Sequence, residues 1–239
     1  MQESLFNDIQ PNDLRQPPLQ QCSVVGSTVI LGDCVQLMKG YADNYFDLAI
    51  VDPPYGIGVA EYDYFAFKGG IRATKGIRNK KKNWDDAVPT KDYWDELFRV
   101  SKNQIVWGAN YYSNIFPVSR GWLAWDKKHP DNVSFSQFEL AWTSFDKINK
   151  MFRMYPTHVA QGVKIHPTQK PIKLYDFILK HYAEKGQRIL DTHLGSGNSA
   201  IAAHYFGCEF VGMEIDEDYY NAMKKRYKEK TSQIAIEGW

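Results

Sequence analysis

From residue 27 onward, short apolar runs alternate with amphipathic segments along the chain. Apolar runs of about four to eight residues are typical of strands that are buried on both faces, and the segments between them are long enough for crossover helices. This alternation predicts one α/β domain over 27–239, with a single, mostly parallel sheet of seven strands. The strands are expected at 28–32, 47–51, 104–107, 121–125, 138–143, 188–191 and 209–214, and the helices at 34–40, 92–100, 110–116, 171–183, 198–206 and 216–230.

Length and composition exclude several classes of protein. Of the 239 residues, 44% are hydrophobic and 24% are charged, so neither global disorder nor a fibrous repeat is expected. The three cysteines lie far apart without a Cys-x-x-Cys pair, so the sequence predicts neither a disulfide framework nor a metal site. There is no basic and apolar leader, and no apolar run approaches the length that a bilayer requires. We therefore expect a soluble, cytoplasmic protein.

Residues 1–26 are polar and contain several prolines, which predicts a flexible N-terminal arm. Within it, Gln2-Glu3-Ser4-Leu5-Phe6 resembles the short peptides with which bacterial proteins dock on the replication sliding clamp, with Leu5 and Phe6 as apolar anchors. The alternative is a frayed chain end with two apolar residues. A sliding clamp is therefore one partner that the sequence suggests.

A segment without a strand pattern, about 56–90, is too long for a bare connection in a compact domain. It carries seven cations and no acid within 68–82, although the net charge of the whole chain is only +1. This basic loop favours a polyanion such as DNA, and the aromatic content of 15% agrees because flat rings stack on bases. The alternative is a solvated loop. The predicted DNA-binding residues are Lys68, Arg72, Lys75, Arg78, Lys80, Lys81 and Lys82.

The apolar run at 47–51 leads directly into Asp52-Pro53-Pro54-Tyr55. Two consecutive prolines lack N–H groups and keep the backbone rigid, so the Asp52 side chain and the proline carbonyls become fixed acceptors. Acceptors beside a flat ring suit a planar molecule with an exocyclic amino group. The alternative is a Pro-Pro turn that only ends the strand. We predict that Asp52, Pro53, Pro54 and Tyr55 are the catalytic residues.

A second motif combines a strand that ends on Asp191, the turn Gly195-Ser196-Gly197, a helix, and a strand that ends on Glu214. The glycine spacing also satisfies the dinucleotide fingerprint, so a nicotinamide oxidoreductase remains an alternative. However, the Asp191 carboxylate would oppose a pyrophosphate and suits a cationic aminoacyl group, while Glu214 suits two ribose hydroxyls. These features describe S-adenosylmethionine, which we predict as the cofactor.

Taken together, these stretches resemble the amino methyltransferases of DNA, whose Asp-Pro-Pro-Tyr motif and Gly-x-Gly loop are both present. Further matching stretches follow in order at 32–34, 122–127 and 138–142, and His166-Pro167-Thr168-Gln169-Lys170-Pro171 opens a helix. The catalytic motif precedes the cofactor loop, which is the permuted order of the family's β group. The resemblance covers most of 28–222 and implies a Rossmann-like methyltransferase fold.

The resemblance also implies positions around the cofactor. It places Asp191 near the methionine amino group, Glu214 near the ribose hydroxyls and Asp33 near the adenine amine, with Thr168, Lys170 and Asn198 near the methionine carboxylate. The chain departs from the family at His193, where an aromatic residue is usual, and in a short recognition segment at about 143–165. The predicted cofactor-binding residues are Asp33, Asp52, Thr168, Lys170, Asp191, His193, Gly195, Ser196, Gly197, Asn198 and Glu214.

The function that the resemblance implies is site-specific methylation of adenine N6 in DNA, in a setting such as restriction and modification. Asp52 and the Pro53 carbonyl would accept the amine hydrogens of a flipped-out base, and Tyr55 would stack on it. Cytosine N4 is the alternative target, although enzymes of that kind usually carry Ser in place of Asp52. An alternative of another class is a non-catalytic DNA-binding subunit. The family often forms homodimers, and action on DNA would associate the protein with the nucleoid.

Overall fold

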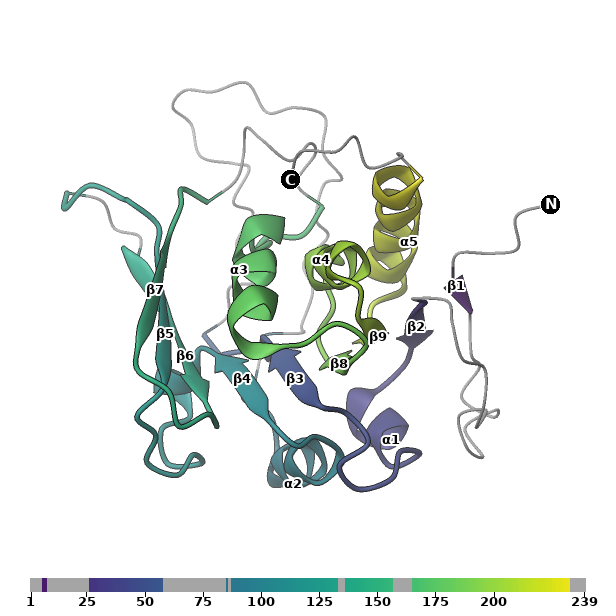
Figure 1. The fold of residues 1–239 in the computed structure, drawn as a ribbon, viewed down its shortest axis with the longest axis horizontal. Helices are drawn as coiled ribbons and strands as arrows, with labels where there is room; N and C mark the ends of the chain where they lie inside the picture. Colours follow the sequence, from purple (N-terminus) through teal and green to yellow (C-terminus); the bar gives the residue numbers. More distant parts are fainter. Residues whose placement is uncertain are drawn as a thin grey trace.

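The computed structural model describes residues 6–7, 26–57, 85, 87–132, 136–156 and 165–232. These residues form one nine-stranded sheet with the order β1-β2-β9-β8-β3-β4-β6-β5-β7 (Figure 1). All neighbouring pairs are parallel except β4–β6 and β6–β5. The strands are β1 (Phe6–Asn7), β2 (Ser27–Leu31), β3 (Leu48–Val51), β4 (Gln104–Trp107), β5 (Trp122–Asp126), β6 (Phe138–Thr143), β7 (Lys150–Arg153), β8 (Arg188–Asp191) and β9 (Glu209–Glu214).

All seven predicted strands are present within one residue of their expected bounds, but the predicted strand number is wrong because each edge gains a strand. At one edge, Phe6–Asn7 pairs with β2, although the sequence predicted only a flexible arm there. At the other edge, β7 pairs with β5. Two residues are too short for a pattern, and β7 lacks a continuous apolar run because it begins with Lys150 and ends with Arg153.

The helices cover both faces of the sheet (Figure 1). Five of the six predicted helices are present, the one at 198–206 with the expected bounds and the other four with ends shifted by one or two residues. The expected helix at 110–116 is wrong, because the chain forms only a 3-10 turn over Ala109–Tyr111. Ser113 and Asn114 are weak helix formers, and Pro117 disfavours helical backbone at the residue before it. The α-helices are α1 (Cys34–Met38), α2 (Lys91–Val100), α3 (Ile172–Tyr182), α4 (Asn198–Phe206) and α5 (Glu217–Thr231).

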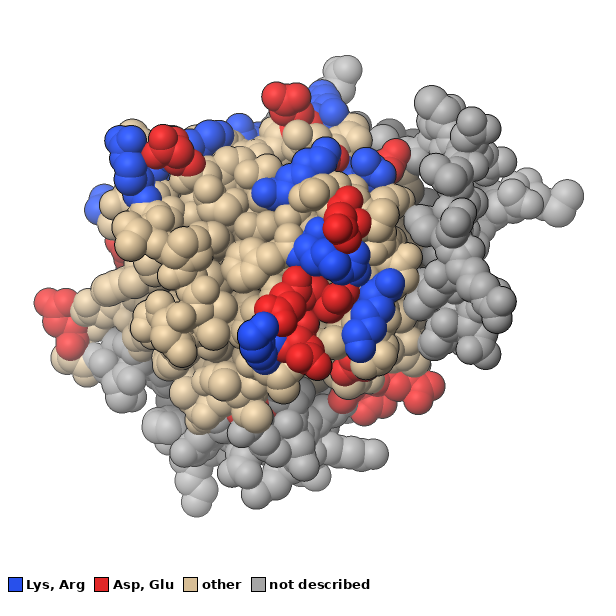
Figure 2. All heavy atoms as spheres, turned by 90° about the horizontal axis from the view of Figure 1, so that it is seen from below, with Lys and Arg blue, Asp and Glu red and all other residues tan. Residues whose placement is uncertain are grey.

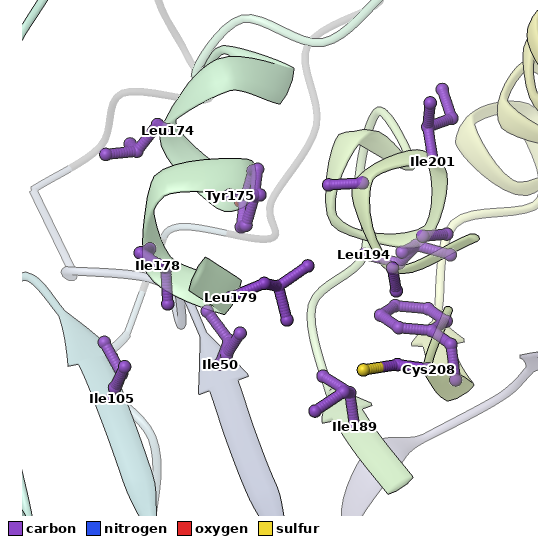
Figure 3. Packing of buried hydrophobic residues seen from close by; sticks show 14 of the residues in the cluster. Ile50, Ile105, Leu174, Tyr175, Ile178, Leu179, Ile189, Leu194, Ile201 and Cys208 are labelled. Carbon is purple, nitrogen blue, oxygen red and sulfur yellow. The ribbon is translucent and has the colours of Figure 1, made fainter. Parts of the chain in front are cut away.

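Two apolar cores lie on the two sides of the sheet, because successive side chains of a strand point to opposite faces. Ile50 and Ile105 pack with α3 and α4 (Figure 3). Val51 and Val106 pack on the other side with α1 and α2. The amphipathic helix α3 contributes Leu174, Tyr175, Ile178 and Leu179 to the first of these cores (Figure 3). None of the described helices combines the length and apolar character of a membrane span.

The parallel strands have their carboxyl ends at the same end of the sheet. The connection from β3 to β4 contains α2, and the connection from β8 to β9 contains α4, which lies on the opposite face (Figure 1). The strand order therefore reverses between the neighbours β3 and β8, and crevices for ligands form outside such switch points. Asp52 follows β3 and Asp191 ends β8, so both predicted acids flank the crevice.

Candidate active site

A cavity of about 240 Å³ lies at the carboxyl ends of the parallel strands. It is lined by residues that follow β2, β3 and β8, by the end of β9, and by the segment that leads into α3. The structure thus brings together residues that are far apart in the sequence. The predicted site residues in the lining are Asp33, Asp52, Pro54, Thr168, Lys170, His193, Gly195, Ser196 and Glu214.

Asp52, the predicted catalytic carboxylate, has two side-chain partners. Tyr55 donates its hydroxyl to Asp52 Oδ1 at 2.6 Å, and Lys170 Nζ forms an ion pair with Oδ2. The Lys170 side chain is only 2% exposed, and its Nζ also lies 3.1 Å from Glu139 Oε2. Glu139 Oε1 in turn forms an ion pair with Lys127 Nζ at 2.6 Å. Four alternating charges therefore run from β5 and β6 to the cavity, and we call Lys127, Glu139, Lys170 and Asp52 the charge chain.

Burial and neighbouring charges compete within the charge chain. Burial raises the pKa of Asp52, and the opposing attraction of Lys170 does not cancel this increase. For Glu139, burial acts in the same direction, but Lys170 and Lys127 outweigh it and lower the pKa. Burial lowers the pKa of Lys170, while Asp52 and Glu139 more than reverse that effect. The chain thus keeps Lys170 charged and makes Asp52 a stronger proton acceptor than an exposed aspartate.

Tyr55 is held on several sides. Its backbone N–H donates to Asp85 Oδ1 at 2.7 Å, and its ring stacks on the half-exposed ring of Tyr111 with centroids 4.8 Å apart. Gly108 approaches the same ring, because a Cβ added there would lie 2.1 Å from Tyr55 Cε1 and 2.5 to 2.6 Å from the two adjacent ring atoms. These distances place the glycine over the face of the ring. The Tyr55 ring is therefore fixed in orientation.

The two proline carbonyls share one donor. Tyr112 Oη lies 2.9 Å from the Pro53 oxygen and 2.8 Å from the Pro54 oxygen. A carbonyl oxygen has two lone pairs, so the Pro53 oxygen can accept a second hydrogen. Tyr112 thus fixes the backbone of the Asp-Pro-Pro-Tyr turn, and the sequence offered no signal for that role.

The two acids of the second motif differ in their access to the cavity. Glu214 lines it and accepts the Gly195 N–H at 2.8 Å, and burial raises its pKa. Asp191 lies behind the lining, where Oδ2 accepts from Ser199 Oγ at 2.6 Å and Oδ1 accepts from the His193 N–H. Burial raises the pKa of Asp191 to about 7. Asp191 thus fixes His193 and Ser199, which lie on either side of the turn Gly195-Ser196-Gly197.

His193 replaces the aromatic residue of the family with a neutral ring. It lines the cavity, and burial lowers its pKa to about 4, so the imidazole carries no charge at neutral pH. Its Nδ1 lies 2.9 Å from Thr192 Oγ1, which lies 2.8 Å from the Tyr93 hydroxyl. A hydrogen-bonded, uncharged ring can form the same flat wall as an aromatic residue.

Asn198 and Gly197 are the predicted cofactor residues that lie outside the lining besides Asp191. The Asn198 amide donates to the Lys170 carbonyl at 2.5 Å, and its Oδ1 accepts from Arg226 Nη1. The same Nη1 donates to the Ser196 carbonyl at 3.0 Å. Asn198 therefore connects the cofactor loop, the segment before α3 and helix α5.

Sequence reasoning missed several residues that hold the site. Glu139 and Lys127 lie inside segments that matched the family, so a signal existed but carried no role. Asp85 and Arg226 had no local signal, because their partners are 30 and 28 residues away. The seven predicted cations of the basic loop lie outside the described residues, as do Gln2 to Leu5 of the clamp-like peptide and 157–164 of the recognition segment.

Charges of both signs mark the described surface. On the face in Figure 2, acidic and basic side chains lie next to one another, and a wide area carries neither. Ion pairs such as Lys91–Asp95, at 2.5 Å, join opposite charges. The charge pattern of that face thus gives no support of its own to the binding of a polyanion.

The fold and the cavity define a class of protein. A mostly parallel sheet covered on both faces, with a cavity at its switch point and a carboxylate of raised pKa in the cavity wall, is typical of an α/β enzyme that uses a small cofactor. The comparison with known families makes this more specific. The chain belongs to the N6_N4_Mtase family, described as DNA methylase, whose profile matches residues 79–225.

Individual relatives agree with this family. Type II methyltransferase M2.MboI of Moraxella bovis is 26% identical over 242 residues, which cover 84% of this chain and 87% of that protein. The crystal structure of the M1.HpyAVI–SAM complex has a TM-score of 0.56 at 19% identity and covers 84% of this chain and 99% of that chain. PvuII DNA methyltransferase, described as cytosine-N4-specific, has a TM-score of 0.57 at 12% identity, covering 86% of this chain and 90% of that one.

Family membership confirms the predicted class, a DNA methyltransferase that uses S-adenosylmethionine. The structural likenesses confirm the Rossmann-like methyltransferase fold, and the permuted motif order is present in the chain. The nicotinamide alternative is thereby set aside. The family includes enzymes for adenine N6 and for cytosine N4, so membership alone leaves both target bases open.

Proposed function

We propose that this protein methylates N6 of an adenine that is flipped out of DNA, and that Asp52 accepts hydrogen bonds from the amino group of that adenine. The observation that carries this proposal is the Asp52 carboxylate in the cavity wall, fixed by Tyr55 and Lys170. A fixed acceptor with a raised pKa is suited to an amine that must lose a proton.

The cavity wall has the chemistry that S-adenosylmethionine requires. Glu214 accepts one backbone N–H at each carboxylate oxygen, at 2.8 and 2.9 Å, so lone pairs remain for the two ribose hydroxyls. Asp33 uses Oδ1 to cap α1 and keeps its other oxygen for the adenine amine. Together with Asp52, these acids favour a cation in the cavity. Thr168 and the neutral ring of His193 complete the cofactor side.

When bound, S-adenosylmethionine supplies a methyl group on a positively charged sulfur; the C–S bond breaks, a C–N bond forms, and a thioether and one proton result. Asp52 accepts hydrogen bonds from the amino group and orients the nitrogen lone pair. The Asp52 carboxylate then takes the proton, which its raised pKa favours. Tyr55 provides a fixed ring beside the base.

The choice of adenine rests on Asp52 itself. PvuII methyltransferase, which is described as cytosine-N4-specific, has a similar fold, so the fold favours neither base. An aspartate at the first position of the motif, where cytosine enzymes usually carry serine, supports adenine. Nucleoside mass spectrometry decides between them.

We further propose that DNA is contacted by the seven cations of the basic loop. Two substitutions to glutamine, Lys80→Gln and Lys81→Gln, should reduce DNA affinity and flatten its salt dependence by about two counterions, because each phosphate contact releases about one. Affinity measured from 50 to 300 mM salt tests this. If the salt dependence of DNA affinity is unchanged in these variants, DNA binds at another surface.

Two partner proposals remain for the whole chain: a homodimer, and a sliding clamp bound through Gln2 to Phe6. The double substitution Leu5→Ala and Phe6→Ala should abolish clamp binding in a pull-down while methylation in solution stays within twofold. Clamp binding that survives this change would contradict the docking role. Light scattering measures the oligomeric state directly.

The decisive experiment is transfer of labelled methyl from S-adenosylmethionine to mixed genomic DNA, followed by nucleoside mass spectrometry. Asp52→Asn should lose about 100-fold or more in rate, because a positioned general base contributes that much. Asp146→Asn is the matched control, since Asp146 is 79% exposed and pairs only with Arg120 among described side chains. N4-methylcytosine would overturn the proposed base, and absence of transfer in the unchanged protein would favour the non-catalytic subunit.

A further inference from the structure

Lys170 lies between two carboxylates rather than beside one. Its side chain is 2% exposed, and Nζ contacts Asp52 Oδ2 and, at 3.1 Å, Glu139 Oε2. The Trp107 ring lies below Nζ, 5.3 Å from it. A buried ammonium is costly unless it is paired, so these contacts determine where the lysine head can rest.

Glu139 is anchored more firmly than Lys170. It lies on β6, paired with Trp125 of β5, and its Oε1 contacts Lys127 Nζ at 2.6 Å. Its second oxygen, Oε2, is buried and has Lys170 as its only ionic partner among the described side chains. A strand position and a second cation thus fix the carboxylate that faces Lys170.

Asp52, by contrast, follows the last residue of β3 and depends on its side-chain partners for orientation. Tyr55 holds Oδ1 and Lys170 holds Oδ2. Loss of the anchor behind Lys170 would leave the lysine free to turn away from Asp52 or to cover its reacting oxygen.

We propose that Glu139 is a positioning residue for methyl transfer: it holds Lys170 against Asp52, so that Lys170 serves the catalytic carboxylate and not the carboxylate of the cofactor. This inference rests on the proposed function and names a residue that acts on the same site through another side chain. If the inference is correct, substitution of Glu139 lowers kcat and leaves cofactor affinity unchanged. Cofactor affinity is left to Asp33, Glu214 and the turn at Gly195.

The test compares Glu139→Gln, Glu139→Asp and Glu96→Gln in the full chain. Glu96→Gln is the matched control, because Glu96 is 18% exposed, close to the 22% of Glu139, and pairs with Arg99 on α2. For each protein, kcat and KM for DNA are measured, together with the Kd for S-adenosylhomocysteine by calorimetry. Unfolding in urea is recorded in parallel.

Glu139→Gln should lower kcat by about 100-fold, with the Kd for S-adenosylhomocysteine within twofold of the unchanged protein. Glu139→Asp keeps the charge with a shorter reach and should recover part of the lost kcat. Glu96→Gln should lower stability without lowering kcat. This combination separates positioning from a merely structural role, which would move stability alone.

Two results would overturn the inference. A rise in the Kd of tenfold or more in Glu139→Gln, with kcat unchanged, would place Lys170 on the cofactor carboxylate. Unchanged kcat and Kd would remove any role for Glu139. Absence of methyl transfer in the unchanged protein would instead contradict the proposed function, so the two failures are distinguishable.

Discussion

Asp52 and Asp191 are both aspartates at the end of a strand, yet their surroundings divide them. Asp52 lines the cavity and faces Lys170, whereas Asp191 lies outside the lining, and its donors among the described residues are neutral, Ser199 and the His193 N–H. The sequence predicted that both would face the cofactor. Strand ends could be located from the apolar pattern, but the direction of each carboxylate depends on packing.

Asp191 should make stability depend on pH. Its pKa in the folded protein is about 7 against 3.8 in an exposed state, so the folded state binds the proton more tightly. The contribution of this group is therefore fully present below about pH 4 and is lost as pH rises through 7, with an upper bound of about 4 kcal/mol. Asp191→Asn should remove that loss, since an amide oxygen can still accept from Ser199.

Urea unfolding at pH 4.5 and pH 7.5 measures this effect. The difference in unfolding free energy between Asp191→Asn and the unchanged protein should shift in favour of the variant at the higher pH. Glu214 also has a raised pKa, so only the difference between the two proteins is informative. A difference that does not change between the two pH values would contradict the prediction.

Gly108 should tolerate no side chain. Its φ is +67°, and a Cβ would lie 2.1 Å from Tyr55 Cε1. Gly108→Ala should therefore displace Tyr55 and lower kcat about tenfold or more, because the ring and its bond to Asp52 move. Gly186→Ala separates strain from collision, since Gly186 has a φ of +81° and nothing within 4 Å.

Both alanine variants should lose about 1 kcal/mol of stability from the backbone. Only Gly108→Ala should lose methyl transfer, measured with labelled cofactor. Equal rates in the two variants would show that Tyr55 can move without consequence.

At the scale of elements, helix α5 supports the cofactor loop through one side chain. Arg226, which is 6% exposed, donates to the Ser196 carbonyl and to Asn198 Oδ1. Asn198 in turn donates to the Lys170 carbonyl. The last helix of the described chain therefore fixes both the glycine turn and the segment that carries Lys170.

Removal of this contact should loosen the loop. Arg226→Met should lower the free energy of unfolding by about 3 kcal/mol, because two buried acceptors lose a charged donor, and should weaken binding of S-adenosylhomocysteine. The neighbouring exposed Lys225→Met is the control and should change neither quantity. Urea unfolding and calorimetry provide the two measurements. Unchanged cofactor affinity in Arg226→Met would show that the loop holds its shape alone.

The elements that the sequence predicted well are those with a continuous apolar signal. The central strands have every residue buried, and their bounds follow from composition alone. The helix expected at 110–116 did not form, because Tyr111 stacks on Tyr55 and Tyr112 donates to the proline carbonyls. Long-range partners of this kind override a short local pattern.

At the scale of the whole molecule, cofactor binding should stabilise the fold selectively. The cavity joins segments after β2, β3, β8 and β9, so a ligand there holds the centre of the sheet. S-adenosylhomocysteine at 100 times its Kd should raise the free energy of unfolding by about 2.7 kcal/mol. NAD at the same concentration should have no effect, and thermal unfolding measures both. Stabilisation by NAD would contradict the assignment of the cavity.

The class of the molecule and its fold could be predicted from the sequence because several motifs occur in one order, and the Asp-Pro-Pro-Tyr and Gly-x-Gly motifs each follow an apolar strand. The charge chain could not, since Lys127, Glu139, Lys170 and Asp52 come from four segments whose contact needs the finished sheet. The hydrogen bond from Arg188 N to Asp47 Oδ2, which joins residues 141 positions apart, likewise forms only when the sheet is complete.

The pairing of β3 with β8 has a consequence for the folding of the chain during its synthesis. The crevice needs Asp52, which leaves the ribosome early, and Asp191 and Glu214, which leave it late. Until β8 has been synthesised, β3 can pair only with β4, and its other edge stays unpaired. A nascent chain that stops before β9 therefore has neither a finished core nor Glu214 in the cavity wall, so we expect cofactor binding only after β9 has been synthesised.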